Sequence, residues 1–279
     1  MEQRKKETVL TLSAKKKAGM PITMVTAYDY TQARLVEAGQ IDTILVGDSL
    51  GNVMLGYDTT IPVTLDDMVH HAKAVRRGAQ NTMMIVDMPF ITYHQTPADT
   101  VRNAGRLMQE AFADAVKLEG GHAIAPHVSA LVQAGIPVCG HIGLTPQSVL
   151  QFGGFKVQGK EEKAAARLVD EALEIEQAGA FLLVIECVPT VVATEITKRL
   201  TIPTIGIGAG QDCDGQVLVF HDLLGFTMQK TAKFVKSYAS LGSQAVDAIA
   251  SYREEVKSRT FPNERYRYDD EVTGFRGES

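Results

Sequence analysis

The sequence predicts a (β/α)8 barrel that forms a single domain over residues 1–279. Eight short apolar segments of strand length alternate with helices, or with connections long enough to hold a helix. Four of these segments end directly in charged residues, which is typical of parallel strands that open onto a polar site. An open doubly wound sheet is the alternative. It needs fewer strands, and it does not explain polar strand ends along the whole chain.

The N-terminal segment is polar and precedes the first strand. Residues 1–20 contain a short helical pattern near 13–18, and we expect this segment to cap the bottom of the barrel. Its basic run, Lys15-Lys16-Lys17, is expected to be a solvated helix face. The first strand covers 22–27, and a helix follows over 31–38, where a glycine ends it.

The next segments continue the alternation of strand and helix. Strand 43–46 leads into a long polar loop over 51–62. Thr64 then caps a helix that runs to about residue 77, with two aspartates in its first turn to complement the helix dipole. The remaining expected elements of this half are strand 83–87, a helix that starts at the Thr-Pro pair of 96–97, and strand 115–119.

The second half repeats the pattern and ends in a tail. Its expected elements are helix 125–133, strand 136–139, helix 160–177, strand 181–186, helix 190–200, strands 204–207 and 217–220, and helix 243–257. Helix 160–177 has a clear apolar face, as expected for packing on a sheet. Residues 261–279 are rich in charge and tyrosine. We expect them to form a surface arm that lies on a neighbouring subunit.

Composition limits the possible partners and the compartment. The net charge of −5 argues against nucleic acid as the main partner. Three cysteines without a CxxC spacing fit a reducing compartment. No apolar run is long enough to cross a bilayer, and the N-terminus lacks an apolar signal core. We therefore expect a cytoplasmic protein that binds neither membrane nor nucleic acid.

Charged residues at the strand ends form the candidate site. They are Asp48, Asp87, Lys117, Glu119, His141 and Glu186. The carboxyl ends of all strands meet on one face of a barrel, so these side chains are expected to converge. Charge is costly to bury without a partner or a function, which makes its repetition at strand ends informative.

The types of these residues suggest a metal-assisted reaction. Asp48, Asp87 and Glu119 would form an all-oxygen site for a hard divalent cation such as Mg²⁺, and no His or Cys cluster competes for zinc. Such an ion can chelate a 2-oxo acid and stabilise the enolate that forms when a neighbouring proton leaves. Lys117 can pair with the same oxygens, and Ser49 can hold the substrate carboxylate. Glu186 is then free to act as the base.

Each of these residues also has a purely structural interpretation. Asp48 could be a helix cap or a loop brace. Lys117 and Glu119 share a strand face and could form a structural ion pair. Glu186 could pair with an arginine, and His141 could be a satisfied structural histidine. Their joint occurrence at strand ends favours the functional interpretation.

Several longer motifs carry a resemblance to a known family. They are 46–51 (VGDSLG), 117–121 (KLEGG), 140–147 (GHIGLTPQ), 185–189 (IECVP), 203–210 (PTIGIGAG), 214–219 (DGQVLV) and His221-Asp222. These segments resemble the signature segments of the ketopantoate hydroxymethyltransferase family, and the similarity covers about residues 23–266. The resemblance implies transfer of a hydroxymethyl group from 5,10-methylenetetrahydrofolate to 3-methyl-2-oxobutanoate, which gives 2-dehydropantoate for pantothenate and coenzyme A synthesis.

The resemblance also implies roles for individual residues. Asp48 and Asp87 correspond to magnesium ligands, with Glu119 nearby through water. Asp48, Ser49, Asp87 and Lys117 correspond to substrate contacts. Glu186 corresponds to the proton acceptor. Members of the family form decamers, so a homodecamer is expected here.

Two other functions would also fit these residues. One is a magnesium-dependent lyase or mutase of the isocitrate lyase or phosphoenolpyruvate mutase kind. Cys139-Gly140-His141 resembles their catalytic cysteine loop, but Ile136-Pro137-Val138 stand where basic residues are expected. The other is a non-catalytic barrel that binds metabolites or organises partners; it would tolerate loss of the acids, which are all present.

Overall fold

A computed structural model describes residues 5–227 and 231–268 of the chain. Eight parallel strands form a closed barrel, and each strand pairs with its neighbours in sequence order. The strands are β1 (Ile22–Thr26), β2 (Thr43–Val46), β3 (Met83–Asp87), β4 (Ala115–Glu119), β5 (Val138–Gly143), β6 (Leu182–Glu186), β7 (Thr204–Ile207) and β8 (Gly215–Leu218). The predicted (β/α)8 barrel is therefore confirmed.

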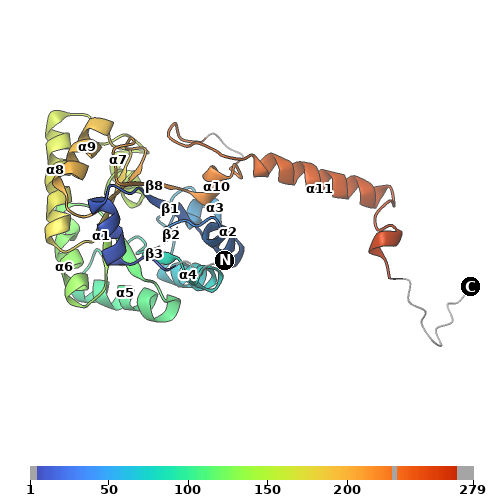
Figure 1. Ribbon diagram of the computed structural model, residues 1–279, viewed down its shortest axis with the longest axis horizontal. Helices are drawn as coiled ribbons and strands as arrows, with labels where there is room; N and C mark the ends of the chain where they lie inside the picture. Colours follow the sequence, from blue (N-terminus) through green and yellow to red (C-terminus); the bar gives the residue numbers. More distant parts are fainter. Residues whose placement is uncertain (1–4, 228–230, 269–279) are drawn as a thin grey trace, which may run out of the picture.

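The connections between strands hold helices that cover the outside of the barrel (Figure 1). The longer ones are α2 (Tyr30–Ala38), α4 (Leu65–Gly78), α5 (Pro97–Ala111), α6 (Ala125–Gln133), α8 (Glu162–Gln177) and α9 (Thr190–Arg199). Short helices are α3 (Leu50–Val53), α7 (Val149–Phe152) and α10 (Phe220–Leu223). The predicted start signals are present: the Thr64 side chain accepts a hydrogen bond from the backbone of Asp67, and Thr96 caps α5 with Pro97 in its first turn.

Several predicted boundaries were wrong, and glycines explain two of them. The helical pattern expected near 13–18 belongs to a longer helix, Val9–Lys17. β5 was expected over 136–139 but runs to Gly143, and β8 was expected over 217–220 but begins at Gly215. Both strands contain glycine because a neighbour comes close: a Cβ at Gly215 would lie 2.2 Å from the carbonyl oxygen of Ile22. A further difference is α3, which occupies the beginning of the expected loop 51–62.

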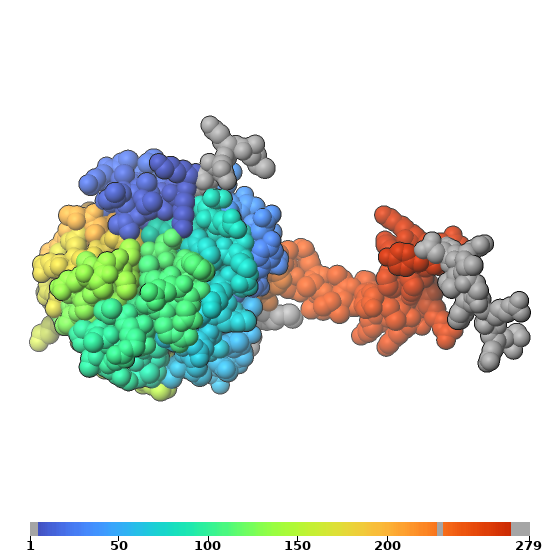
Figure 2. Space-filling view, turned by 90° about the horizontal axis from the view of Figure 1, so that it is seen from below, coloured from blue at the N-terminus to red at the C-terminus, as the bar shows by residue number. Residues whose placement is uncertain are grey.

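The apolar core has two layers. Inward-facing strand residues fill the barrel interior, and a larger cluster lies between the strands and the surrounding helices. Leu12 of helix α1 (Val9–Lys17) is fully buried in the interior cluster, so α1 closes the bottom of the barrel. Figure 2 shows the N-terminal segment packed on the rounded body of the molecule.

Two lysines of α1 are paired, which corrects the expectation of a solvated basic face. Lys15 Nζ lies 2.6 Å from Asp42 Oδ1, and Lys16 Nζ lies 2.7 Å from Asp214 Oδ2. Each of these acids directly precedes a strand, β2 or β8. The lysines therefore connect the closing helix to the bottom rim of the barrel.

The C-terminal helix extends away from the barrel. Helix α11 (Leu241–Lys257) projects outward as a long arm, and residues up to 268 follow it (Figures 1 and 2). The rest of the predicted tail, 269–279, lies outside the described residues. Among the described residues, no helix has the length and apolar character needed to span a bilayer.

Candidate active site

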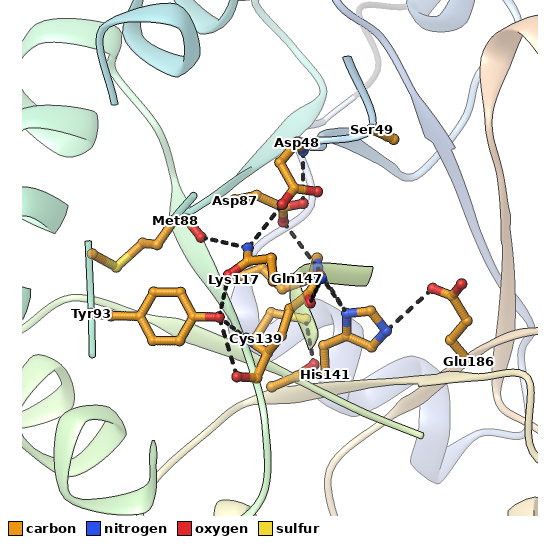
Figure 3. Close-up of polar contacts among 12 residues, drawn as sticks. Asp48, Ser49, Asp87, Met88, Tyr93, Lys117, Cys139, His141, Gln147 and Glu186 are labelled. Carbon is orange, nitrogen blue, oxygen red and sulfur yellow. Dashed lines mark hydrogen bonds and ion pairs between the residues drawn. The ribbon is translucent and has the colours of Figure 1, made fainter. Parts of the chain in front are cut away.

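The strand-end residues come together in one pocket at the carboxyl end of the barrel. The pocket is lined by Asp48, Ser49, Asp87, Lys117, Glu119, His141 and Glu186, among others. They come from β3, β4, β5, β6 and the turn after β2 (Figure 3). The expected convergence of these side chains is thus observed, although the chemical roles assigned to them are a separate question.

Strand register explains the order of the residues around the pocket. Asp87 pairs with Lys117 across β3 and β4, and Glu119 pairs with His141 across β4 and β5. Gly143 pairs with Glu186 across β5 and β6. The φ of Gly143 is 93°, and a Cβ there would lie 2.2 Å from the Glu186 carbonyl oxygen. Only glycine allows this close approach.

Lys117 is the cation at the centre of the pocket. Its side chain is buried, and Nζ lies 3.1 Å from Asp87 Oδ1 and 3.8 Å from Glu119 Oε1. Burial opposes its charge, but Asp87, Glu119 and Asp48 together hold the pKa of Lys117 above its usual value. Lys117 therefore stays positively charged. Its closer carboxylate is Asp87, so the expected alternative of a simple Lys117–Glu119 pair describes only part of the arrangement.

The surroundings of Asp48 and Asp87 disfavour two negative charges, because both side chains are buried among other carboxylates. Burial raises the pKa of Asp48 well above its usual value, and repulsion from Glu119 and Asp87 adds to this. Burial and Glu119 also raise the pKa of Asp87, against the attraction of Lys117. The backbone N–H of Asp48 donates to Asp87 Oδ2 at 3.0 Å, whereas Lys117 Nζ, 3.1 Å away, is the partner of Asp87 Oδ1. The buried carboxylates whose pKa values are raised by one another suit a cation.

The carboxylate oxygens of the pocket suit a hard cation whose remaining coordination positions are filled by water or substrate. Within the described part of the chain, no three His, Cys, Asp or Glu side chains are grouped closely enough to hold a metal by themselves. Mg²⁺ typically takes one or two carboxylates and completes its shell with water and substrate. Asp48 and Asp87 fit that requirement, and Glu119 lines the same pocket.

His141 links the two ends of the pocket. Its Nδ1 lies 3.3 Å from Glu119 Oε1, and its Nε2 lies 3.3 Å from Glu186 Oε2. Although burial and Lys117 oppose protonation, Glu119 and Glu186 raise the pKa of His141 to about 9. The ion-pair partner of Glu186 is therefore this histidine and not the arginine considered from the sequence. The Glu186 side chain is 17% exposed, so it faces the open part of the pocket.

Gln147 and Tyr93 brace the acids, and neither was among the residues predicted from the sequence to have a role. Gln147 Nε2 donates to Asp48 Oδ2 at 2.8 Å, and its backbone N–H donates to Glu119 Oε2 at 3.1 Å. The Tyr93 hydroxyl donates to Gln147 Oε1 at 2.7 Å. Gln147 is the last residue of the motif 140–147, and this position in the motif could have identified it from the sequence. Tyr93 lies in the loop after β3, where no local pattern distinguished it.

Ser49 has a tyrosine partner. The Tyr28 and Ser49 hydroxyls lie 2.8 Å apart, and Tyr28 is fully buried. Burial raises the pKa of Tyr28, so its hydroxyl stays protonated. Tyr28 directly follows the first predicted strand, and this position at a strand end could have identified it.

Cys139 does not fit the role of a reactive cysteine. It is fully buried in the barrel interior, and burial raises the pKa of its thiol to about 12. The thiol donates to the carbonyl oxygen of Gly140 at 3.4 Å. Catalytic cysteines need an accessible thiolate, so this geometry weighs against the cysteine-loop lyase considered from the sequence.

Comparison with known proteins agrees with the motifs. The family model described as ketopantoate hydroxymethyltransferase matches residues 6–264. The chain belongs to this family of transferases. The ketopantoate hydroxymethyltransferase family was also the resemblance indicated by the sequence, which is therefore confirmed.

Curated relatives cover nearly the whole chain. A protein of Geobacillus kaustophilus named 3-methyl-2-oxobutanoate hydroxymethyltransferase is 56% identical over 247 residues, which is 88% of each chain. Proteins with the same name from Syntrophus aciditrophicus and Moorella thermoacetica are 54% and 52% identical. They cover 95% and 96% of this chain, and 97% and 100% of their own length.

Solved structures share the fold at low sequence identity. A phosphonopyruvate hydrolase has a TM-score of 0.60 at 13% identity and covers 92% of this chain and 90% of its own. A putative phosphonomutase from Burkholderia cenocepacia has a TM-score of 0.59 at 14% identity, with 90% and 100% coverage. At this level of identity the similarity shows the fold alone.

Proposed function

We propose that this protein transfers a hydroxymethyl group from 5,10-methylenetetrahydrofolate to 3-methyl-2-oxobutanoate and so forms 2-dehydropantoate, a step toward pantothenate and coenzyme A. The name of the relatives supports the acceptor and the reaction class. The observation that carries the mechanism is that Asp48, Asp87, Lys117 and Glu186 line one pocket. This pocket offers anionic ligands, a fixed cation and a separate carboxylate.

Asp48 and Asp87 are the residues that would hold Mg²⁺, with Glu119 contributing through water. Their raised pKa values and the hydrogen bond from the Asp48 backbone to Asp87, which places the two residues side by side, support this assignment. When bound, the ion supplies a Lewis acid that makes the C3 proton of the oxo acid more acidic.

The protein's own residues position the oxo acid and move the proton. Ser49 and its backbone amide hold the substrate carboxylate, and the Lys117 ammonium stabilises negative charge on the substrate oxygens. Glu186 accepts the C3 proton, and the electron pair left on C3 forms the new bond to the one-carbon carbon. Water supplies the hydroxyl oxygen, and the bonds from that carbon to N5 and N10 of the folate break, so that tetrahydrofolate leaves with both nitrogen electron pairs. His141 Nε2 lies 3.3 Å from Glu186 Oε2, which supports a role in holding that carboxylate in place.

Replacing Glu186 tests the base directly. Glu186→Gln keeps the size of the side chain but cannot accept a proton. Deuterium exchange at C3 of 3-methyl-2-oxobutanoate, measured without folate, should fall by roughly 100-fold or more. Magnesium binding should remain close to wild type. Glu162→Gln, on the exposed start of α8, is the matched control. Undiminished exchange in Glu186→Gln would rule out Glu186 as the base.

Replacing Asp87 tests the metal site. Asp87→Ala should weaken magnesium binding in calorimetry by at least about tenfold, because one of the two direct ligands is lost. It should weaken oxo-acid binding only when magnesium is present. Asp170→Ala, which removes an exposed acid of α8, should leave both affinities unchanged. Normal magnesium affinity in Asp87→Ala would contradict the assignment.

We also propose that the protein works in the cytoplasm as a homodecamer. Cys139, Cys187 and Cys213 are all free thiols, which agrees with a reducing compartment. The exposed apolar residues of α11 support assembly with further copies of the chain.

A further inference from the structure

The walls of the pocket include a charged side and an aliphatic side, and Thr26, Leu45 and Asp222 line the pocket as well. Asp87, Lys117, Glu119 and His141 come from β3, β4 and β5 and form the charged side. On the other side, Val184, Ile207 and Val217 come from β6, β7 and β8. Val184 and Val217 are 2% and 3% exposed and belong to the interior cluster, against which Ile207 also packs. The aliphatic side is therefore a packed surface.

Strand geometry places the proposed base at the border between the two sides. Residues two apart on a strand face the same way, so Val184 and Glu186 both point into the barrel. Glu186 pairs in register with Ile207 of the neighbouring strand. The carboxylate that accepts the C3 proton thus lies next to Val184 and Ile207. The polar partner of Glu186, His141, comes from the charged side.

We propose that Val184, Ile207 and Val217 form an alkyl subsite that determines which 2-oxo acids the enzyme accepts. This inference rests on the proposed function and adds the source of its substrate specificity. The carboxylate and keto groups of the substrate belong on the charged side, and the C3–H bond must point at Glu186. The two remaining substituents of C3 then face the aliphatic side. The subsite favours small alkyl groups there.

The same geometry excludes polar 2-oxo acids. A second carboxylate or a hydroxyl on the C3 side of the substrate would lose its hydration against these three side chains, none of which carries a hydrogen-bonding group. A larger alkyl group would clash with a packed wall, since Val184 and Val217 have little room to move. Selectivity should therefore depend on both the polarity and the volume of the substituents on C3.

The test compares two isoleucines of β7 that lie at different distances from the pocket along the same strand. Ile207 and Ile205 lie two residues apart and both pack in the barrel interior, but only Ile207 lines the pocket. Each is replaced by valine, which removes one methylene from the same strand. The ratio of kcat/KM for 3-methyl-2-oxopentanoate to kcat/KM for 3-methyl-2-oxobutanoate is measured, together with C3 deuterium exchange for both acids.

Ile207→Val should shift this ratio toward the longer acid by on the order of tenfold, the usual effect of one methylene in an apolar pocket. Ile205→Val should leave the ratio within about twofold of wild type. Val217→Ala provides a second pocket variant with the same expected direction, in case Ile207→Val does not fold. Thermal melting shows which variants are folded.

The outcomes separate the inference from the function on which it rests. An unchanged ratio in folded Ile207→Val and Val217→Ala, or an equal shift in Ile205→Val, would overturn the alkyl subsite while the wild-type reaction stands. Efficient wild-type exchange of 2-oxoglutarate would also overturn it. A wild-type protein that neither exchanges nor transfers with any 2-oxo acid would overturn the proposed function, and the subsite with it.

Discussion

Gln147 uses every hydrogen-bonding group of its side-chain amide. Nε2 donates to Asp48 Oδ2 and to the carbonyl oxygen of Met88, and Oε1 accepts from the Tyr93 hydroxyl. An amide with all partners assigned has one stable orientation. Because Gln147 is buried, it holds Asp48 in a fixed position beside Asp87. The geometry of the candidate metal site thus depends on an uncharged residue that contributes no metal ligand of its own.

Gln147→Glu should therefore damage both stability and activity. The new carboxylate would face Asp48 and leave the carbonyl oxygen of Met88 without a donor. We expect a loss of about 3 kcal/mol in the free energy of unfolding, measured by urea titration. C3 exchange should also fall. Gln133→Glu introduces the same charge at an exposed position of α6 and should be nearly neutral. Equal stability of the two variants would contradict this account.

Helix α1 is attached to the barrel by acids that precede strands. Asp42 precedes β2, pairs with Lys15 and accepts from the backbone N–H of Thr23 at 2.9 Å. Asp214 precedes β8, pairs with Lys16 and accepts from the backbone N–H of Thr204 at 2.8 Å. Each acid thus joins the closing helix to the first residues of neighbouring strands. This bottom rim stabilises the fold, whereas the opposite face holds the pocket.

The role of Asp42 predicts a pH dependence of stability. Partial burial opposes its charge, but Lys15 and Thr23 hold the pKa of Asp42 below its usual value. The stabilisation is thus present above the usual pKa of aspartate, about 4, and is lost as pH falls through the lower folded-state pKa. Asp42→Asn should cost about 2 kcal/mol at pH 7, and less at pH 3, in urea titrations. A cost that does not fall at pH 3 would refute this, and exposed Asp170→Asn is the control.

The whole molecule consists of a closed barrel and an unsupported arm. Val246, Ile249, Tyr252 and Val256 of α11 are between 43% and 67% exposed. Their spacing of three or four residues places them on one face of the helix. An isolated helix of this length is marginally stable in water and needs a partner for its apolar face. The arm is therefore suited to contact a second copy of the chain.

Ile249→Asp should lower the oligomeric state. A charge in the middle of this apolar face would be buried in any interface that covers it. We expect light scattering after size-exclusion chromatography to give a mass below that of the proposed decamer. Ser251→Asp, on the opposite face of α11, should keep the wild-type mass. If Ile249→Asp assembles like the wild type, then this face of α11 is not an interface.

Local pattern was sufficient for most of the fold and for the composition of the site. Strand and helix periodicity depends on neighbours along the chain, so eight strands and their order could be predicted, with errors at glycines such as Gly143 and Gly215. Asp87 and Glu186 were identifiable because each ends an apolar strand, and Asp48 because it lies two residues after one. The family motifs also indicated the class of reaction. The match to the ketopantoate hydroxymethyltransferase family supports that class.

Only the tertiary structure decided how these residues meet. Gln147 reaches Asp48 across 99 positions of sequence, and Lys16 reaches Asp214 across 198. The closure of the barrel places Lys117 3.1 Å from Asp87 and sets Val184, Ile207 and Val217 opposite the charged side. Such contacts depend on strand register and on which side chains share the interior. Neither is encoded by any short stretch of the chain, because each results from the packing of all eight strands together.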